Sequence, residues 1–120
     1  MTTSPRPRSK SGLSESVIEK ICGVFVKYPE VEKAVLYGSR AKGNYWNGSD
    51  IDLTLCGGGD LTLSVRNRIA VELDDLLLPY MIDLSIFRDI SDPDMIAHIR
   101  RVGTPVYVRP QQLKDEGSTG

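Results

Sequence analysis

The sequence is poor in the residues that build metal clusters and covalent cross-links. It has two cysteines, Cys22 and Cys56, and a single histidine, His98. A zinc site usually takes four such ligands, so this chain has too few of the usual kind, and two isolated thiols give no disulfide pattern. Free thiols without a secretory leader favour a cytoplasmic protein.

The chain also lacks an excess of charge and a long apolar run. Fifteen basic residues against sixteen acidic ones leave a net charge of −1, which argues against a general nucleic-acid-binding surface. No apolar stretch approaches the roughly 20 residues that span a bilayer. Neither a Walker-type GxxxxGK[ST] nor a GxGxxG pattern is present, and Gly57–Gly59 is better interpreted as a flexible turn.

What is present fits one small domain. A chain of 120 residues is large enough for one core and too short for a second substrate domain. Residues 1–12, with two prolines and several basic residues, are predicted to be a disordered arm. Residues 13–109 form the predicted domain, and residues 110–120 a flexible tail.

Hydrophobic periodicity predicts four helical segments and four strands. We expect a helix after the Ser14 cap to about Tyr28, a short turn over 39–43, and helices over 61–77 and 93–102. Strands are expected over 31–37, 51–55, 80–87 and 105–108. The result is an α/β domain with a mixed β-sheet packed against helices, mainly on one side. The short link before Ile51 favours an antiparallel first pair of strands.

Three acids stand inside apolar strands. Asp50 and Asp52 alternate with core residues, so their side chains leave one strand face about 7 Å apart. Like charges this close repel unless a cation neutralises them, and Mg²⁺ prefers such oxygen ligands. If the next strand is a neighbour, Asp83 joins them, and three carboxylates could hold two metal ions for phosphoryl or nucleotidyl transfer. Solvated or hydrogen-bonded structural acids are the alternative.

A glycine-serine turn precedes the acids. Gly38 lets backbone N–H groups approach a phosphate closely, and the Ser39 hydroxyl can donate another hydrogen bond. Arg40 and Lys42 add positive charge, although both could simply be solvated. Gly43 lets the chain turn back toward Asp50.

The run GSRAKG, then SDIDL, then a single strand acid resembles the nucleotidyltransferase superfamily related to DNA polymerase beta. More narrowly it resembles the minimal nucleotidyltransferases, which pair with HEPN-domain proteins, often as antitoxin and toxin. The resemblance spans about residues 13–108. It implies the nucleotidyltransferase fold.

For the site, the resemblance implies nucleotide contacts at Gly38, Ser39 and Ser49, with Arg40 and Lys42 as further candidates. It also implies that Asp50, Asp52 and Asp83 bind two Mg²⁺ ions, with Asp83 helping to deprotonate the acceptor.

The reaction that the resemblance implies is transfer of AMP from ATP to a hydroxyl, in some members a tyrosine of the partner toxin. Two alternatives stay open. The chain could act as an antitoxin or regulatory subunit by binding alone. It could instead modify a small molecule of the aminoglycoside type, with a homodimer building the acceptor pocket, because larger relatives use a second domain that this chain has no room for.

Other residues carry less information. Tyr45 and Trp46 could stack on a base, cover a partner surface or pack on their own loop. His98 is interpreted as a surface or half-buried residue on the last helix, without a catalytic role. The leucines spaced along 61–77 are expected in the core.

Overall fold

The computed structural model describes residues 12–43 and 50–110. In chain order the elements are α1 (Glu15–Phe25), β1 (Lys33–Tyr37), α2 (Ser39–Lys42), β2 (Ile51–Cys56), α3 (Leu63–Asp74), β3 (Ile82–Ile86), a 3₁₀ turn (Phe87–Asp89), α4 (Pro93–Val102) and β4 (Thr104–Val108). The predicted arm, apart from Gly12, the predicted loop 44–49 and the tail beyond Pro110 lie outside the described residues.

The four strands form one mixed sheet in the order β3-β2-β1-β4. β1 pairs antiparallel with β2, as the short link before Ile51 predicted, and it also pairs antiparallel with β4. β2 and β3 pair in parallel, because α3 carries the chain back across the sheet between them. The predicted small α/β domain with a mixed sheet is confirmed.

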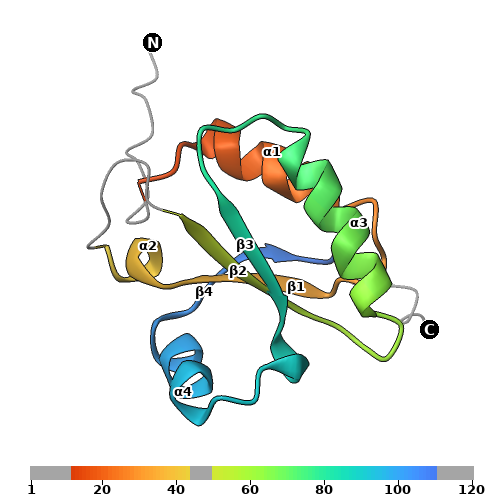
Figure 1. Ribbon diagram of the computed structural model, residues 1–120. Helices are drawn as coiled ribbons and strands as arrows, with labels where there is room; N and C mark the ends of the chain where they lie inside the picture. Colours follow the sequence, from red (N-terminus) through yellow and green to blue (C-terminus); the bar gives the residue numbers. More distant parts are fainter. Residues whose placement is uncertain (1–11, 44–49, 111–120) are drawn as a thin grey trace, which may run out of the picture.

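The helices lie on both faces of the sheet, but unequally. In Figure 1, α1 and α3 lie side by side over one face, and α4 packs beneath the other. Side chains of β1 alternate between the two faces of the sheet. Ala34 and Leu36 point into the main core, whereas Val35 and Tyr37 pack with Ile99 of α4 on the other face. The shorter α4 leaves part of its face open, which makes room for a site.

The main core fills the space between the sheet and the pair α1–α3. Its fully buried side chains come from every layer and include Phe25, Val31, Ile51, Leu53, Leu55, Leu61 and Ile69. The predicted stripe is confirmed at Leu61, Val65, Ile69 and Leu73, whereas Leu63 and Leu77 are exposed, contrary to the expectation for the leucines of this segment. Burial of the core side chains is the main favourable contribution to folding, at roughly 1.5–3 kcal/mol each.

Side-chain caps define where the long helices begin. Ser14 and Thr62 each accept a hydrogen bond from a backbone N–H three residues on, and Asp92 accepts one from Asp94. The Ser14 and Asp92 caps were predicted. α3 begins two residues later than expected because Thr62 caps it, and Leu61 packs in the core instead.

Some ends differ from the sequence prediction for local reasons. α1 ends at Phe25 rather than near Tyr28. The first strand begins at Lys33, because the N–H of Val31 bonds to the carbonyl of Tyr28 in a turn. α3 ends at Asp74, and shortly afterwards Leu77 adopts a positive φ of 55°, which a helix cannot accommodate. Among the described residues, no helix is both long and apolar enough to cross a membrane.

Candidate functional site

The strand register brings two of the predicted acids face to face. Asp52 of β2 is the direct partner of Asp83 of β3, and Tyr37 of β1 is the partner of Asp52 on the other side. These three residues form one row across the sheet, on the face that α4 only partly covers. Asp50 stands two residues before Asp52, at the mouth of β2, and its side chain is exposed.

Burial and the neighbouring carboxylates make Asp52 harder to ionise. Burial, followed by the charges of Asp83 and Asp50, raises the pKa of Asp52 above its ordinary value. Burial also raises the pKa of the Tyr37 phenol; a hydrogen bond with Ser85 works against this, and Asp52 and Asp83 add to it. This face therefore holds carboxylates whose mutual repulsion a bound cation would relieve.

Gly38 lies directly against Asp52. Its backbone has φ 79° and ψ −156°, a region that L side chains rarely adopt, and it sits between the end of β1 and the start of α2. A Cβ at this position would overlap Oδ2 of Asp52. The turn thus needs glycine both for its conformation and for its close approach to the acid.

The rest of the predicted turn forms as expected. Ser39 begins α2 and is half-buried. Gly43 closes the helix with φ 85°, and its N–H bonds to the carbonyls of Arg40 and Ser39, so the chain turns back as predicted. The turn therefore brings Gly38 and Ser39 to the same end of the sheet as Asp52.

Arg40 is buried, so the solvated alternative for this residue is wrong, whereas its contact with phosphate stays a prediction. Its side chain is only 2% exposed, and its guanidinium lies 4.8 Å from the centre of the Tyr80 ring. A guanidinium enclosed in this way favours a structural role over contact with a dissolved triphosphate. Lys42, by contrast, is exposed.

A cleft opens over the row of acids. Its volume is about 380 Å³, and it is lined by Tyr37, Gly38, Asp52, Asp83, Asp92, Asp94, Met95 and His98. The sheet supplies one wall and the start of α4 supplies the other. The cleft gives a substrate direct access to both paired acids and to the glycine turn.

Five of the residues that line this cleft were not predicted as part of a site, and His98 and Asp94 are the two that bear most on its chemistry. His98 is half-buried, as expected, but its Nε2 accepts a hydrogen bond of 3.1 Å from the N–H of Gly38. Asp94, in the first turn of α4, lines the same cleft. The only sequence signal was that both lie on a helix following the strand of Asp83, which does not reveal the direction in which that helix packs.

The acids have the right chemistry for a magnesium site. Carboxylates on one sheet face are the oxygen donors that Mg²⁺ prefers, and a bound cation would offset the burial and the like charges that raise the pKa of Asp52. Within residues 12–43 and 50–110, no three His, Cys, Asp or Glu side chains already converge on one point. The donor set therefore fits the ion, with side-chain rotation needed to gather it.

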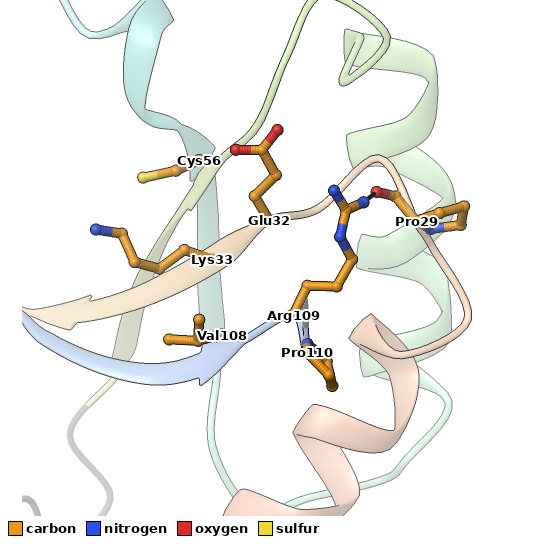
Figure 2. Close-up of a pocket in the computed structure, with 7 residues that line it drawn as sticks. All are labelled: Pro29, Glu32, Lys33, Cys56, Val108, Arg109 and Pro110. Carbon is orange, nitrogen blue, oxygen red and sulfur yellow. Dashed lines mark hydrogen bonds between the residues drawn. The ribbon is translucent and has the colours of Figure 1, made fainter. Parts of the chain in front are cut away.

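A larger hollow lies at the opposite end of the same strands. It measures about 750 Å³ and is drawn in Figure 2, where the side chains of Lys33, Cys56 and Glu32 surround it. Its Arg109 guanidinium is already bonded to the carbonyl of Pro29. This hollow contains neither the paired acids nor the glycine turn, so we place the candidate site at the other end.

Three of the residues singled out in the sequence lie outside the described part of the chain. They are Ser49, Tyr45 and Trp46. Their proposed contacts with a nucleotide or partner therefore stay predictions.

Comparison with known proteins agrees with this geometry. The family model described as "Polymerase beta, Nucleotidyltransferase" matches residues 19–112, which span every element that carries the site. A comparison with curated proteins finds no match.

Several solved structures share the fold. A toxin–antitoxin structure with AMP-PNP is 25% identical, with a TM-score of 0.62 over 87% of this chain and 79% of that one. A complex of a tri-AMPylated Shewanella oneidensis HEPN toxin with an MNT antitoxin is 21% identical, with a TM-score of 0.60 over 85% of this chain and 76% of that one. An MntA-HepT toxin–antitoxin structure is 19% identical, with a TM-score of 0.60 over 86% and 77%.

Proposed function

The chain belongs to the polymerase beta nucleotidyltransferase family, and from this membership we propose that it transfers AMP from ATP to a hydroxyl acceptor. In this reaction the acceptor oxygen forms a bond to the α-phosphorus of ATP. The bond between that phosphorus and the bridging oxygen breaks, and pyrophosphate leaves. The acceptor proton passes to a base.

The observation that carries the proposal is the register of the acids with the glycine turn packed against them. Asp52 faces Asp83 across two parallel strands, and Gly38 fits against the Asp52 carboxylate with no space for a side chain. The two carboxylates suit a metal ion, and a glycine turn at the start of a helix suits a phosphate. A nucleoside triphosphate with its metal ions is a ligand that uses both.

We assign the following roles to the residues. The turn binds the triphosphate through the N–H and hydroxyl of Ser39, because the Gly38 N–H already donates to His98, and the exposed Lys42 adds a positive charge. Asp50, Asp52 and Asp83 are the residues that would hold two Mg²⁺ ions. When bound, Mg²⁺ neutralises triphosphate charge and makes the α-phosphorus more electrophilic.

The proton of the acceptor is taken up at a carboxylate oxygen of Asp83. This side chain is exposed on an edge strand, so an acceptor can reach it from solvent. Most of the remaining rate enhancement comes from aligning the reactants and stabilising charge, because the protein forms no covalent bond to the substrate in phosphoryl transfer of this kind.

The proposed acceptor is a tyrosine of a HEPN-domain partner. The cleft has one wall from the sheet and one from α4, and the described part of the chain offers no second lobe to grip an acceptor. A partner protein can supply that missing wall, and complexes of an antitoxin with a HEPN toxin are among the structural relatives. The proposal places the reaction in the cytoplasm, where Cys22 and Cys56 stay reduced.

The test is a labelling reaction with purified proteins. The chain is mixed with ATP labelled at the α-phosphate, Mg²⁺ and the product of the neighbouring gene, and label on the partner is measured. We expect strong labelling that falls at least about a thousandfold in Asp50→Asn/Asp52→Asn. Asp74→Asn, an exposed acid at the end of α3, is the matched control and should label normally.

The same experiment separates the rival functions. Neutralisation of a toxic partner that persists in the double variant, without labelling, would support an antitoxin that works by binding alone. Label incorporated into a small molecule in the absence of any partner would support an aminoglycoside-type enzyme, and sedimentation would then be expected to show a homodimer.

A further inference from the structure

The only histidine of the sequence connects α4 to the glycine turn. His98 Nε2 accepts the N–H of Gly38 at 3.1 Å, across 60 residues of chain. A ring nitrogen that accepts a hydrogen bond carries no proton, so the neutral ring holds its proton at Nδ1. This bond joins the last helix to the turn that approaches the catalytic acids.

The His98 ring is held in place by its neighbours. It meets the Tyr37 ring edge-on, with centroids 6.2 Å apart and planes at 79°. The next residue, Ile99, is buried in a small cluster with Val35 and Tyr37, which anchors α4 on the sheet. The imidazole is therefore aimed at Gly38 from a fixed helix.

The Gly38 backbone has an unusual conformation that a hydrogen bond can stabilise. Gly38 has a conformation outside the regular helix and strand regions, and its position is set against Oδ2 of Asp52. Glycine is also the residue with the most backbone freedom to lose on ordering. A hydrogen bond donated by the Gly38 N–H to the fixed His98 ring restricts that freedom before a nucleotide arrives.

We propose that His98 is a positioning residue, which fixes the Gly38–Ser39 turn relative to Asp52 and thereby sets the affinity for the nucleotide. This inference rests on the proposed function, since it names a residue that prepares the same site. His98 acts through Gly38 and does not touch the reacting atoms. Its loss should therefore weaken nucleotide binding more than it slows the chemical step.

Two variants separate the acceptor from the ring. His98→Phe keeps a flat ring for Tyr37 but removes the acceptor, whereas His98→Gln restores an acceptor oxygen at similar reach. Binding of AMP-PNP with Mg²⁺ is measured by calorimetry, together with kcat and KM for ATP. We expect about tenfold weaker binding and a comparable rise in KM for His98→Phe, with most of the loss recovered in His98→Gln.

A direct readout does not depend on activity. In the unsubstituted protein, a scalar coupling across the hydrogen bond between the Gly38 amide nitrogen and His98 Nε2 should be measurable by nuclear magnetic resonance. Arg101→Gln, at an exposed position on α4, controls for a change to this helix and should bind AMP-PNP normally. Melting temperatures show whether each variant is folded. If His98→Phe does not fold, the coupling in the unsubstituted protein still tests whether His98 contacts Gly38.

The outcomes distinguish the two proposals. Absence of the coupling, unchanged AMP-PNP binding in folded His98→Phe, or a His98→Gln variant as weak as His98→Phe would each overturn the positioning role. If the unsubstituted protein binds AMP-PNP in a His98-dependent way but transfers no label to any acceptor, the positioning role is supported and the proposed transferase activity fails instead.

Discussion

Asp52 and Asp83 lie directly opposite each other on parallel strands, although 31 positions separate them in the sequence. Two carboxylates in register on one sheet face repel each other, and this repulsion contributes to the raised pKa of Asp52. A site with this built-in repulsion is less stable empty than filled by a cation. Several measurable consequences follow from this pair and from the turn beside it.

Magnesium should stabilise the folded protein through these acids. Ion binding to the folded state alone raises the free energy of unfolding, by about 2.7 kcal/mol when the free ion is at about 100 times its Kd. We expect Mg²⁺ to raise the melting temperature, EDTA to reverse the rise, and Asp52→Asn to abolish it. Asp74→Asn should respond like the unsubstituted protein, and an equal shift in Asp52→Asn would show that the ion binds elsewhere.

Stability should depend on pH through Asp52. Because its folded pKa is raised, the folded state binds more protons than the unfolded state just above the ordinary Asp pKa of about 3.9. Stability then falls as the pH rises from about 4 through the folded pKa, and the loss is complete above it. Asparagine does not titrate, so in metal-free buffer Asp52→Asn should lose less stability than the unsubstituted protein as the pH rises from about 4 through the folded pKa of Asp52. Thermal melts at several pH values test this, and parallel profiles would contradict it.

Gly38→Ala should damage both the fold and the site. The new Cβ would overlap the Asp52 carboxylate and would hold a non-glycine residue at φ 79°. Strain of this kind costs on the order of 1–3 kcal/mol, to which the displaced carboxylate adds a loss of nucleotide binding.

Gly23→Ala is the matched control for that substitution. Gly23 lies within α1, and a Cβ added there would meet no neighbouring atom within 4 Å, so alanine should stabilise the helix by roughly 0.5–1 kcal/mol. Chemical denaturation of both variants gives the comparison. A Gly38→Ala protein as stable as the parent would mean that the turn tolerates a different conformation.

Arg40 and Lys42 should separate structure from binding, despite sharing one turn of helix. Arg40→Ala removes a buried guanidinium from the Tyr80 ring and should lower stability by about 2 kcal/mol or more. Lys42→Ala, at an exposed position, should change stability by less than about 0.5 kcal/mol and weaken nucleotide affinity instead. Urea unfolding measures the change in stability, and AMP-PNP titration measures the change in affinity. If Arg40→Ala weakened affinity and left stability unchanged, Arg40 would be a phosphate ligand after all.

Leu77 offers a test of strain away from the site. It is 87% exposed and has a positive φ of 55°, where a leucine side chain gains little packing to offset its backbone strain. Leu77→Gly should stabilise the protein by about 0.5–1 kcal/mol. A loss of stability in urea unfolding would indicate that the leucine makes contacts that matter more than its backbone.

The sequence was most informative where local patterns and the fold agree. Period-two alternation placed Asp50, Asp52 and Asp83 off the core, and the sheet has Asp52 and Asp83 in one row with Tyr37. The cap at Asp92 likewise marked the start of α4 correctly. These features depend on neighbours within a few residues, so the sequence carries them directly.

Features that depend on distant packing could not be predicted. Arg40 is buried because Tyr80, 40 positions later, lies beneath its guanidinium, and no local pattern announces such a partner. His98 contacts Gly38 only because α4 packs against β1 through Ile99, and that packing is tertiary. In both cases the sequence gives the residue type but not the neighbours that surround it in the fold.

The parallel pairing of β2 with β3 has a consequence for how such a chain can change over generations. The two strands are aligned by backbone hydrogen bonds, so residues added or lost in the α3 crossover leave the opposed acids where they are. A single residue deleted inside Ile82–Ile86 would instead rotate Asp83 to the interior face. Changes in the length of the loops that flank α3 therefore preserve the opposed acids, whereas a deletion within the five residues of β3 does not.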